Sequence, residues 1–248
     1  QTTGAAAGSG FIFSDDGYIL TNYHVVSGAT SITVSTYDGT NYDAKVVGFD
    51  ESNDVAVLKI EAEGLTPVVI GDSDKLNVGD EVVAIGNPLG ELTFSETSGI
   101  ISALDREVTI SQGSTMDLIQ TDCAINSGNS GGALFNMHGE VIGITNAKYS
   151  SSSSSSTASV DNIGFAIPMN HVYNIVKSII ENGYIEKPYI GVGVLTVSSE
   201  TQKYGLPAGA AVQTITKDSP AEAAGLQVND IITKANETEI TTQNDLVK

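Results

Sequence analysis

The amino-acid sequence predicts a mainly β protein whose strands form closed or sandwiched antiparallel sheets. Short apolar segments recur through the first two-thirds of the chain, with turn signals between them. Helical periodicity stands out in one segment, 169–181. After it, the stretch 186–188 is typical of a linker, and the residues that follow have strand and turn signals of their own. We therefore expect two domains, 1–185 and 188–248.

Turn signals place the expected strands. Asp15-Asp16-Gly17 is the signal of a first hairpin, and Asp38-Gly39 is that of a second turn. Apolar residues cluster or alternate with polar ones on both sides of these turns, as half-buried strands require. The strands expected around and after them are 11–13, 18–20, 32–34, 44–49, 55–60, 81–85, 99–103, 133–135 and 141–145.

The segment 169–181 predicts an amphipathic helix, because its apolar residues recur with helical spacing on one face. Asn170 is the expected N-cap, and Gly183 is the expected C-terminal stop. The apolar face consists of Val172, Ile175, Val176, Ile179 and Ile180.

Composition excludes several classes of protein. The 248 residues carry a formal net charge of −19, which disfavours binding to nucleic acid or to anionic membrane surfaces. Cys123 is the single cysteine, so no intramolecular disulfide can form. No apolar run is long enough to span a bilayer, and no signal peptide is visible. The first expected strand begins close to Gln1. We therefore expect that an export signal or a membrane anchor preceded Gln1 and was removed.

The sharpest motif is Gly128-Asn129-Ser130-Gly131-Gly132. A serine nucleophile needs a tight turn, a neighbouring base and donors for the developing oxyanion. Glycines around Ser130 permit such a turn and a close approach of substrate. The backbone N–H groups of Gly128 and Ser130 are the candidate oxyanion donors. A turn of small residues without chemistry is the competing interpretation.

The candidate base is one of three histidines. His24 follows a predicted strand amid apolar residues, whereas His138 falls at a predicted hairpin tip and His171 at the start of the helix. The third member of the site is expected to be a buried carboxylate that orients the imidazole. Asp54 directly precedes the strand 55–60, and Asp50 is its rival.

The order of these residues along the chain adds weight. His24, Asp54 and Ser130 follow one another in the order of the chymotrypsin constellation, whereas other serine hydrolases with the same geometry use different orders. An all-β architecture fits the same template. The sequence therefore indicates a His-Asp-Ser catalytic triad.

Five motifs together resemble the HtrA (DegP-like) serine proteases over nearly the whole chain. Two of the motifs contain the candidate base His24 and the candidate acid Asp54. A third motif lies between Asp54 and Ser130, a fourth contains Ser130, and the fifth directly precedes the predicted helix. They are Thr21-Asn22-Tyr23-His24-Val25-Val26, Asn53-Asp54-Val55-Ala56-Val57-Leu58-Lys59, Ile85-Gly86-Asn87-Pro88-Leu89-Gly90, Gln120-Thr121-Asp122-Cys123-Ala124-Ile125-Asn126-Ser127-Gly128-Asn129-Ser130-Gly131-Gly132 and Gly164-Phe165-Ala166-Ile167-Pro168.

The resemblance implies two six-stranded antiparallel β-barrels of the trypsin/chymotrypsin type over 1–185, followed by a PDZ domain. It also implies that the protein hydrolyses peptide bonds in unfolded or misfolded proteins in the bacterial cell envelope, outside the cytoplasm. Such a protein would assemble as a homotrimer, and neither a metal nor a cofactor is expected.

The resemblance also implies a primary specificity pocket. Its floor would be Ala124, six residues before the nucleophile, with the remaining positions forming walls. Because Ala124 carries no charge, we expect a small, mainly apolar pocket that prefers small aliphatic residues with loose discrimination. The implied walls are Thr145, Asn146, Ala147 and Gly164.

Residues 188–248 resemble a PDZ domain that is truncated at its C-terminal end. The resemblance implies a loop in which backbone N–H groups capture the C-terminal carboxylate of a peptide that adds as a strand. This loop would be formed by Tyr189, Ile190, Gly191 and Val192. A protease-fold binding or chaperone-like protein with little turnover, and a scaffold acting through the PDZ segment, are the alternative functions.

Overall fold

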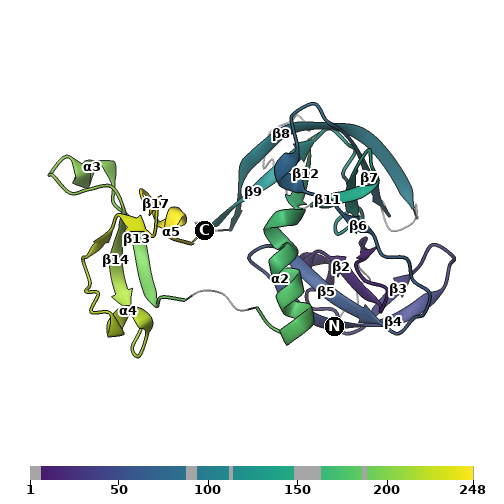
Figure 1. Ribbon diagram of the computed structural model, residues 1–248, viewed down its shortest axis with the longest axis horizontal. Helices are drawn as coiled ribbons and strands as arrows, with labels where there is room; N and C mark the ends of the chain where they lie inside the picture. The colour runs from purple at the N-terminus through teal and green to yellow at the C-terminus, as the bar shows by residue number, and fades with distance from the viewer. Residues whose placement is uncertain (1–6, 88–93, 112–113, 148–162, 186–188, 248) are drawn as a thin grey trace. The chain divides into compact units, whose positions relative to one another are not determined.

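The computed structural model describes residues 7–87, 94–111, 114–147, 163–185 and 189–247. The chain divides into two compact units, residues 1–185 and 186–248. Both units are built mainly of β-strands (Figure 1). The predicted linker 186–188 lies outside the described residues.

The first unit begins with a five-stranded antiparallel sheet in the order β1-β2-β5-β4-β3. Its central strand β5 contributes side chains to two hydrophobic cores, because successive side chains of a strand point to opposite faces. Val55 and Val57 belong to one hydrophobic cluster, whereas Ala56, Leu58 and Ile60 belong to another. The strands are β1 (Phe11–Ile12), β2 (Tyr18–Thr21), β3 (Ile32–Ser35), β4 (Asn41–Asp50) and β5 (Val55–Ile60).

A second sheet of seven strands follows the order β10-β7-β8-β9-β12-β11-β6. Pairing between β10 and β11 closes six of these strands into a barrel, and β6 adds to β11 in parallel. The strands are β6 (Val69–Ile70), β7 (Glu81–Gly86), β8 (Ser95–Ser111), β9 (Ser114–Thr121), β10 (Ala133–Asn136), β11 (Glu140–Thr145) and β12 (Gly164–Pro168).

The sequence predicted two six-stranded barrels. The structure instead has one closed six-stranded barrel and one open five-stranded sheet. Within the described residues, β1 and β3 are the outer strands of the five-stranded sheet and do not pair with each other. A strand as short as β1 has few backbone groups to offer a second partner.

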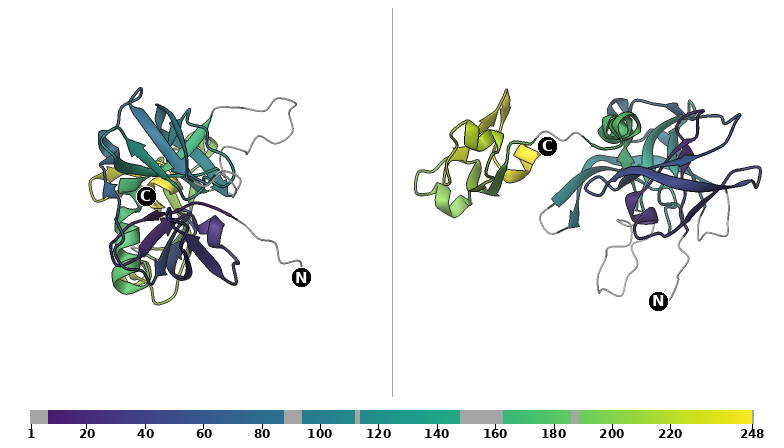
Figure 2. Two further views of the ribbon diagram at one scale, coloured as in Figure 1. Left: turned by 90° about the vertical axis from the view of Figure 1, so that its right-hand side faces the viewer. Right: turned by 90° about the horizontal axis from the view of Figure 1, so that it is seen from below.

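Helix α2 (Met169–Asn182) confirms the predicted amphipathic helix, and Val172, Val176 and Ile179 are fully buried. It contacts β4 and β5 of the first sheet and β11 and β12 of the barrel (Figure 1 and Figure 2). Gly183 ends the helix as predicted, with φ 77° and its N–H donating to the carbonyl of Ile179. No helix within the described ranges is long and apolar enough to cross a membrane.

The prediction that Asn170 caps α2 is wrong. The N-cap position is Pro168, and no side chain caps the helix there. Asn170 instead bonds the short helix η1 (Ser73–Lys75) and the residue before it. Asn170 Oδ1 accepts from Ser73 N at 3.3 Å, and Asn170 Nδ2 donates to Asp72 Oδ1 at 2.7 Å. The side chain of Asn170 therefore bonds residues almost a hundred positions earlier in the chain and does not cap its own helix.

The second unit has a three-stranded sheet in the order β13-β14-β15 and a two-stranded hairpin, β16-β17. Ser219 caps one of its helices by accepting a hydrogen bond from Glu222 N at 3.3 Å. The elements are β13 (Val192–Thr196), α3 (Ser199–Gln202), β14 (Ala210–Ile215), α4 (Pro220–Ala223), β15 (Ile231–Ile232), β16 (Lys234–Ala235), β17 (Thr238–Glu239) and α5 (Gln243–Val247).

Cys123, just after β9, is a buried free thiol. Burial raises the pKa of the thiol, because the low-polarity interior disfavours the charged thiolate. Cys123 packs within the hydrophobic core of the barrel, and its raised pKa disfavours the thiolate, which is the reactive form of cysteine.

Candidate active site

The structure brings His24 and Asp54 together. His24 lies in the short helix α1 (Tyr23–Val26), and Asp54 lies in the turn between β4 and β5 with a left-handed φ of 50°. His24 Nδ1 is 2.7 Å from Asp54 Oδ2, and Asp54 Oδ1 accepts from His24 N at 2.9 Å. Because a carboxylate accepts hydrogen bonds, Nδ1 is the donor. In the neutral ring, Nε2 is then the nitrogen that carries the lone pair.

The sequence left Asp50 and Asp54 as rival candidates for the carboxylate that orients His24, and their hydrogen bonds distinguish them. Asp50 is buried, but its carboxylate accepts hydrogen bonds from its own turn, namely Ser52 N at 2.9 Å and Asn53 Nδ2 at 2.7 Å. Asp54 bonds His24 with both carboxylate oxygens, Oδ2 to the ring Nδ1 and Oδ1 to the backbone N–H. Of the two, Asp54 has the contacts of an orienting acid.

Two asparagines fix Asp54 further, and sequence reasoning missed this role for both. Asn146 Nδ2 donates to Asp54 Oδ2 at 2.7 Å, and Asn22 Nδ2 donates to Asp54 O at 2.8 Å. Asn146 follows β11 and is fully buried. Its amide therefore crosses from the barrel to the first sheet. The side chain of the predicted wall residue Asn146 bonds Asp54, and its backbone N–H donates to Phe165 O at 2.9 Å.

Ser130 lies in a turn, and its hydroxyl faces the segment Asn146-Ala147 that follows β11. It is 4% exposed, and Ser130 Oγ accepts a hydrogen bond from Ala147 N at 3.1 Å. Asn146 and Ala147 are consecutive, so neighbouring residues after β11 hold the Asp54 carboxylate and the Ser130 hydroxyl. A Cβ on Gly8 would meet both Val25 of α1 and the carbonyl of Ser130. Residues 128–132 carry the candidate nucleophile Ser130, and we call them the nucleophile turn. This turn and the helix that carries His24 are thus neighbours.

The backbone around Ser130 has the conformation that the glycines predicted. Gly128 has φ 99°, in the left-handed region that favours glycine. The N–H groups of Asn129 and Gly131 donate to carbonyls of the surrounding turn and of β11. Within the described part of the chain, the N–H groups of Gly128 and Ser130 have no such acceptor. They are available as donors to a bound group.

Gly131 supplies a prediction for stability, because its φ is 86° and a Cβ there would lie 2.3 Å from both Ser9 O and Thr21 Oγ1. We expect Gly131→Ala to lower the free energy of unfolding in urea by more than about 4 kcal/mol. Gly139→Ala is the matched control, because Gly139 has φ 76° but a Cβ added there would meet nothing within 4 Å. That change adds only the left-handed penalty of about 1–2 kcal/mol. Equal losses in the two variants would contradict the steric argument.

Of the other predicted pocket residues, Thr145 and Ala124 contact the nucleophile turn. Thr145 is fully buried, and Thr145 Oγ1 donates to Asn129 O at 2.6 Å. Ala124 is exposed, and its carbonyl accepts from Asn129 Nδ2 at 3.0 Å. Gly164 packs tightly, since a Cβ there would lie 2.6 Å from Ile125 Cγ1. Thr145 and Ala124 thus contact the nucleophile turn through polar groups, whereas Gly164 packs against Ile125.

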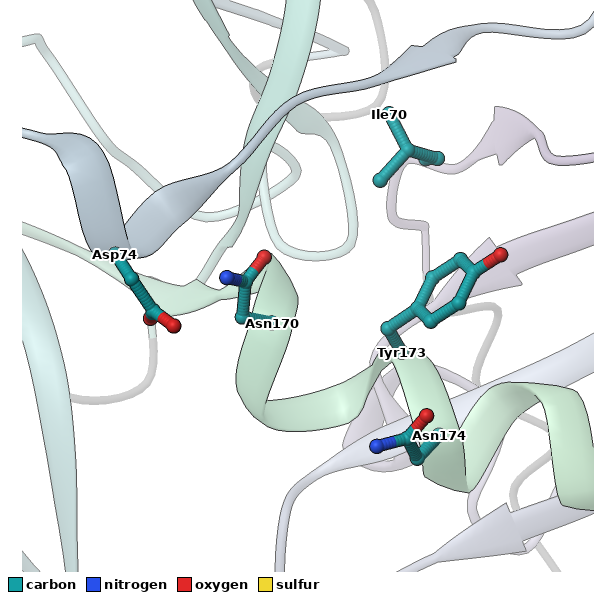
Figure 3. A pocket seen from close by; sticks show the side chains of 5 residues that line it. All are labelled: Ile70, Asp74, Asn170, Tyr173 and Asn174. Carbon is teal, nitrogen blue, oxygen red and sulfur yellow. The ribbon is translucent and has the colours of Figure 1, made fainter.

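A surface cavity of the first unit lies away from these residues. A cavity of about 510 Å³ is lined by residues of η1 and α2 and by Ile70 (Figure 3). Tyr173 and Asn174 stand on one side of it and Asp74 on the other. No residue of the predicted site lines this cavity.

The predicted carboxylate loop of the second unit begins with exposed side chains. Tyr189 and Ile190 are 61% and 44% exposed, whereas Gly191 is buried with φ 83°. A Cβ on Gly191 would lie 2.2 Å from Ser219 Cβ, so this position requires glycine. Val192 begins β13. The loop therefore leads directly into a sheet strand.

Comparison with known proteins places both units. Residues 8–144 match the trypsin-like peptidase domain, and residues 188–248 match the PDZ domain. The serine protease Do-like HtrA of Lactococcus lactis is 41% identical over 98% of this chain and 63% of its own length. A probable periplasmic serine endoprotease DegP-like of Chlamydia trachomatis is 42% identical over 97% of this chain and 48% of its own length. The chain thus spans about half to two-thirds of these relatives.

A solved structure gives the same result. The HtrA-type protease AlgW with decapeptide superimposes with a TM-score of 0.83 and is 40% identical to this chain. The match covers 97% of this chain and 73% of that one. The sequence motifs, the barrel and these similarities agree, and the chain belongs to the HtrA-type serine proteases of the trypsin-like peptidase family.

Proposed function

We propose that this chain is a serine endopeptidase that uses Ser130 as nucleophile, His24 as general base and Asp54 as the acid that orients His24. One observation carries the proposal: the 2.7 Å contact between His24 Nδ1 and Asp54 Oδ2, anchored by Asn146 next to the residue that bonds Ser130 Oγ. One short segment, Asn146-Ala147, thus bonds both Asp54 and Ser130, and Asp54 in turn bonds His24, which supports the positioning of the three groups for catalysis.

In the proposed mechanism, His24 Nε2 takes the proton from Ser130 Oγ as this oxygen attacks the scissile carbonyl. Asp54 stabilises the imidazolium that forms and keeps the ring in the orientation needed for transfer. His24 then gives the proton to the leaving amine, and water releases the acyl group from Ser130 by the same steps. Each of these steps uses only side chains of this chain, the substrate and water.

The proposed oxyanion hole consists of the N–H groups of Gly128 and Ser130. Both are without acceptors in the described part of the chain, and they flank Asn129 in a turn held by its neighbours. Each donor of this kind lowers the barrier by about 3 kcal/mol in comparable enzymes, because it acts on charge that develops in the transition state.

We propose unfolded polypeptides as substrates, with cleavage after small aliphatic residues. The uncharged Ala124, with Thr145, Ala147 and Gly164 around it, supports a small apolar pocket that has no partner for lysine or arginine. The solved relative AlgW has been captured with a decapeptide and with a tripeptide, which supports peptides as the ligand class. In the second unit, we propose that the loop Tyr189-Ile190-Gly191-Val192 takes the C-terminus of a peptide.

The relatives also support a location and an assembly. Two of them, from Chlamydia trachomatis and Pseudomonas putida, are named periplasmic endoproteases. We therefore propose an extracytoplasmic location for this protein. A homotrimer is the proposed assembly, by the same family resemblance.

The proposal is tested by digestion of a permanently unfolded, reduced and alkylated protein, together with labelling by a fluorophosphonate probe. We expect cleavage after small aliphatic residues, and we expect mass spectrometry to locate the phosphonyl group on Ser130. Labelling of another residue, or cleavage after lysine or arginine, would contradict the assignment. Absence of both cleavage and labelling would favour the alternative of a protease-fold binding protein with little turnover.

A further inference from the structure

Ser9, just before β1, makes four hydrogen bonds to three other segments of the first unit. Its N–H donates to Ser130 O at 2.8 Å, and its hydroxyl donates to Gly128 O at 2.7 Å. The same hydroxyl accepts from Asn87 N at 2.7 Å, directly after β7. Its carbonyl accepts from Thr21 Oγ1 at 2.7 Å, at the end of β2. Every polar group of Ser9 is therefore used.

Two glycines allow these approaches. A Cβ on Gly131 would lie 2.3 Å from Ser9 O, and a Cβ on Gly86 would lie 2.9 Å from Ser9 Oγ. The first glycine belongs to the nucleophile turn, and the second is the last residue of β7. Because side chains are missing at both positions, Ser9 reaches the backbone itself.

The two carbonyls that Ser9 bonds flank one peptide unit. Gly128 O belongs to the peptide between residues 128 and 129, and Ser130 O belongs to the peptide between 130 and 131. The peptide between them carries the N–H of Ser130, which is one of the two proposed oxyanion donors. A peptide unit turns most easily when its neighbours also move, so fixing both neighbours restrains this N–H.

We propose that Ser9 is a positioning residue that holds the nucleophile turn in the conformation needed for oxyanion binding. The inference rests on the proposed function of Ser130. Through Asn87 N, the same hydroxyl also joins the turn to Asn87, the residue directly after β7.

The test compares Ser9→Ala with wild type on a peptide substrate. The change leaves the Gly128 carbonyl and the Asn87 N–H without their partner, and we expect kcat to fall about 10- to 100-fold. KM should change less than about threefold, because an oxyanion donor acts on the transition state rather than on bound substrate. Ser9→Thr keeps a hydroxyl and should recover most of kcat.

Ser14→Ala is the matched control. Ser14 is also a serine of the N-terminal hairpin, but its hydroxyl bonds Asp16 within the same turn. We expect its kcat to equal that of wild type. A loss of kcat in Ser14→Ala as large as that in Ser9→Ala would overturn the proposal.

A second readout is independent of turnover. Amide hydrogen exchange, followed by mass spectrometry, reports on the N–H groups of Asn129, Gly131 and Gly132, which are bonded within the turn or to β11. We expect faster exchange of residues 126–132 in Ser9→Ala, with unchanged exchange of β14 in the second unit. Unchanged exchange of 126–132 would overturn the role of Ser9. If wild type neither cleaves nor labels, the proposed function fails, and exchange still decides whether Ser9 orders the turn.

Discussion

Ser130→Ala will hydrolyse an unfolded protein about 10⁶-fold more slowly than the wild type, the loss seen when the serine of a comparable triad is removed. The change deletes the attacking oxygen and leaves the base and the oxyanion donors in place. Rates are measured on a quenched fluorescent peptide at saturating concentration, and the residual rate is checked against a protein-free blank.

The folded structure should survive this change. The Ser130 hydroxyl accepts one hydrogen bond, from Ala147 N, and its removal leaves a small hole in the turn. A loss of about 1 kcal/mol corresponds to a fall in the midpoint of thermal unfolding of about 2–4 °C for a domain of this size. Ser35→Ala, at an exposed serine on the outer strand β3, controls for loss of a hydroxyl and should keep full activity. Cleavage by Ser130→Ala within tenfold of wild type would exclude Ser130 as the nucleophile.

Asp54→Asn is expected to lower kcat by about 10⁴-fold, the magnitude known for this change in the triad template. Three donors converge on the carboxylate: His24 Nδ1 and Asn146 Nδ2 on Oδ2, and His24 N on Oδ1. An asparagine has one acceptor atom and one NH₂ group, so at least one of these donors must face another donor. If the NH₂ group faces the ring, the ring proton moves to Nε2, and His24 can no longer accept a proton from Ser130.

The backbone makes Asp54→Asn a clean test of chemistry. Asp54 has φ 50°, and asparagine is among the few residues that adopt the left-handed region readily. The rival carboxylate supplies the control: Asp50→Asn loses stability, since Asp50 is buried and bonded to its own turn, but should keep kcat within about tenfold. Equal losses of kcat in the two variants would contradict the assignment of Asp54.

Much of the strand and helix pattern could be predicted from the sequence, because apolar periodicity and turn residues are local. The expected strand 55–60 has the bounds of β5, and Gly183 ends α2 as its left-handed preference requires. The strand expected at 99–103 is instead β8, which begins at Ser95 and ends at Ser111. Its polar first residues, Ser95-Glu96-Thr97, give no apolar signal, although they pair with β7.

The site was predictable to the extent that it lies in short motifs. Gly128 to Gly132 pointed to a nucleophile turn, and His24 stood out among three histidines. The residues that tie the site together could not be found in this way. Asn146 bonds Asp54 across 92 positions of sequence, and Ser9 bonds Gly128 across 119. A lone asparagine or serine is common at strand ends, and only the three-dimensional pairing of segments distinguishes these two.

The packing of α2 has a consequence for how the protein is made. This helix follows the barrel in the chain, yet Val172 and Val176 share a core with Val55 and Val57 of β5. On the ribosome, the first sheet therefore emerges before the helix that completes this core. His24 and Asp54 are likewise synthesised before Ser130, so a nascent chain that ends before Ser130 lacks one member of the proposed triad.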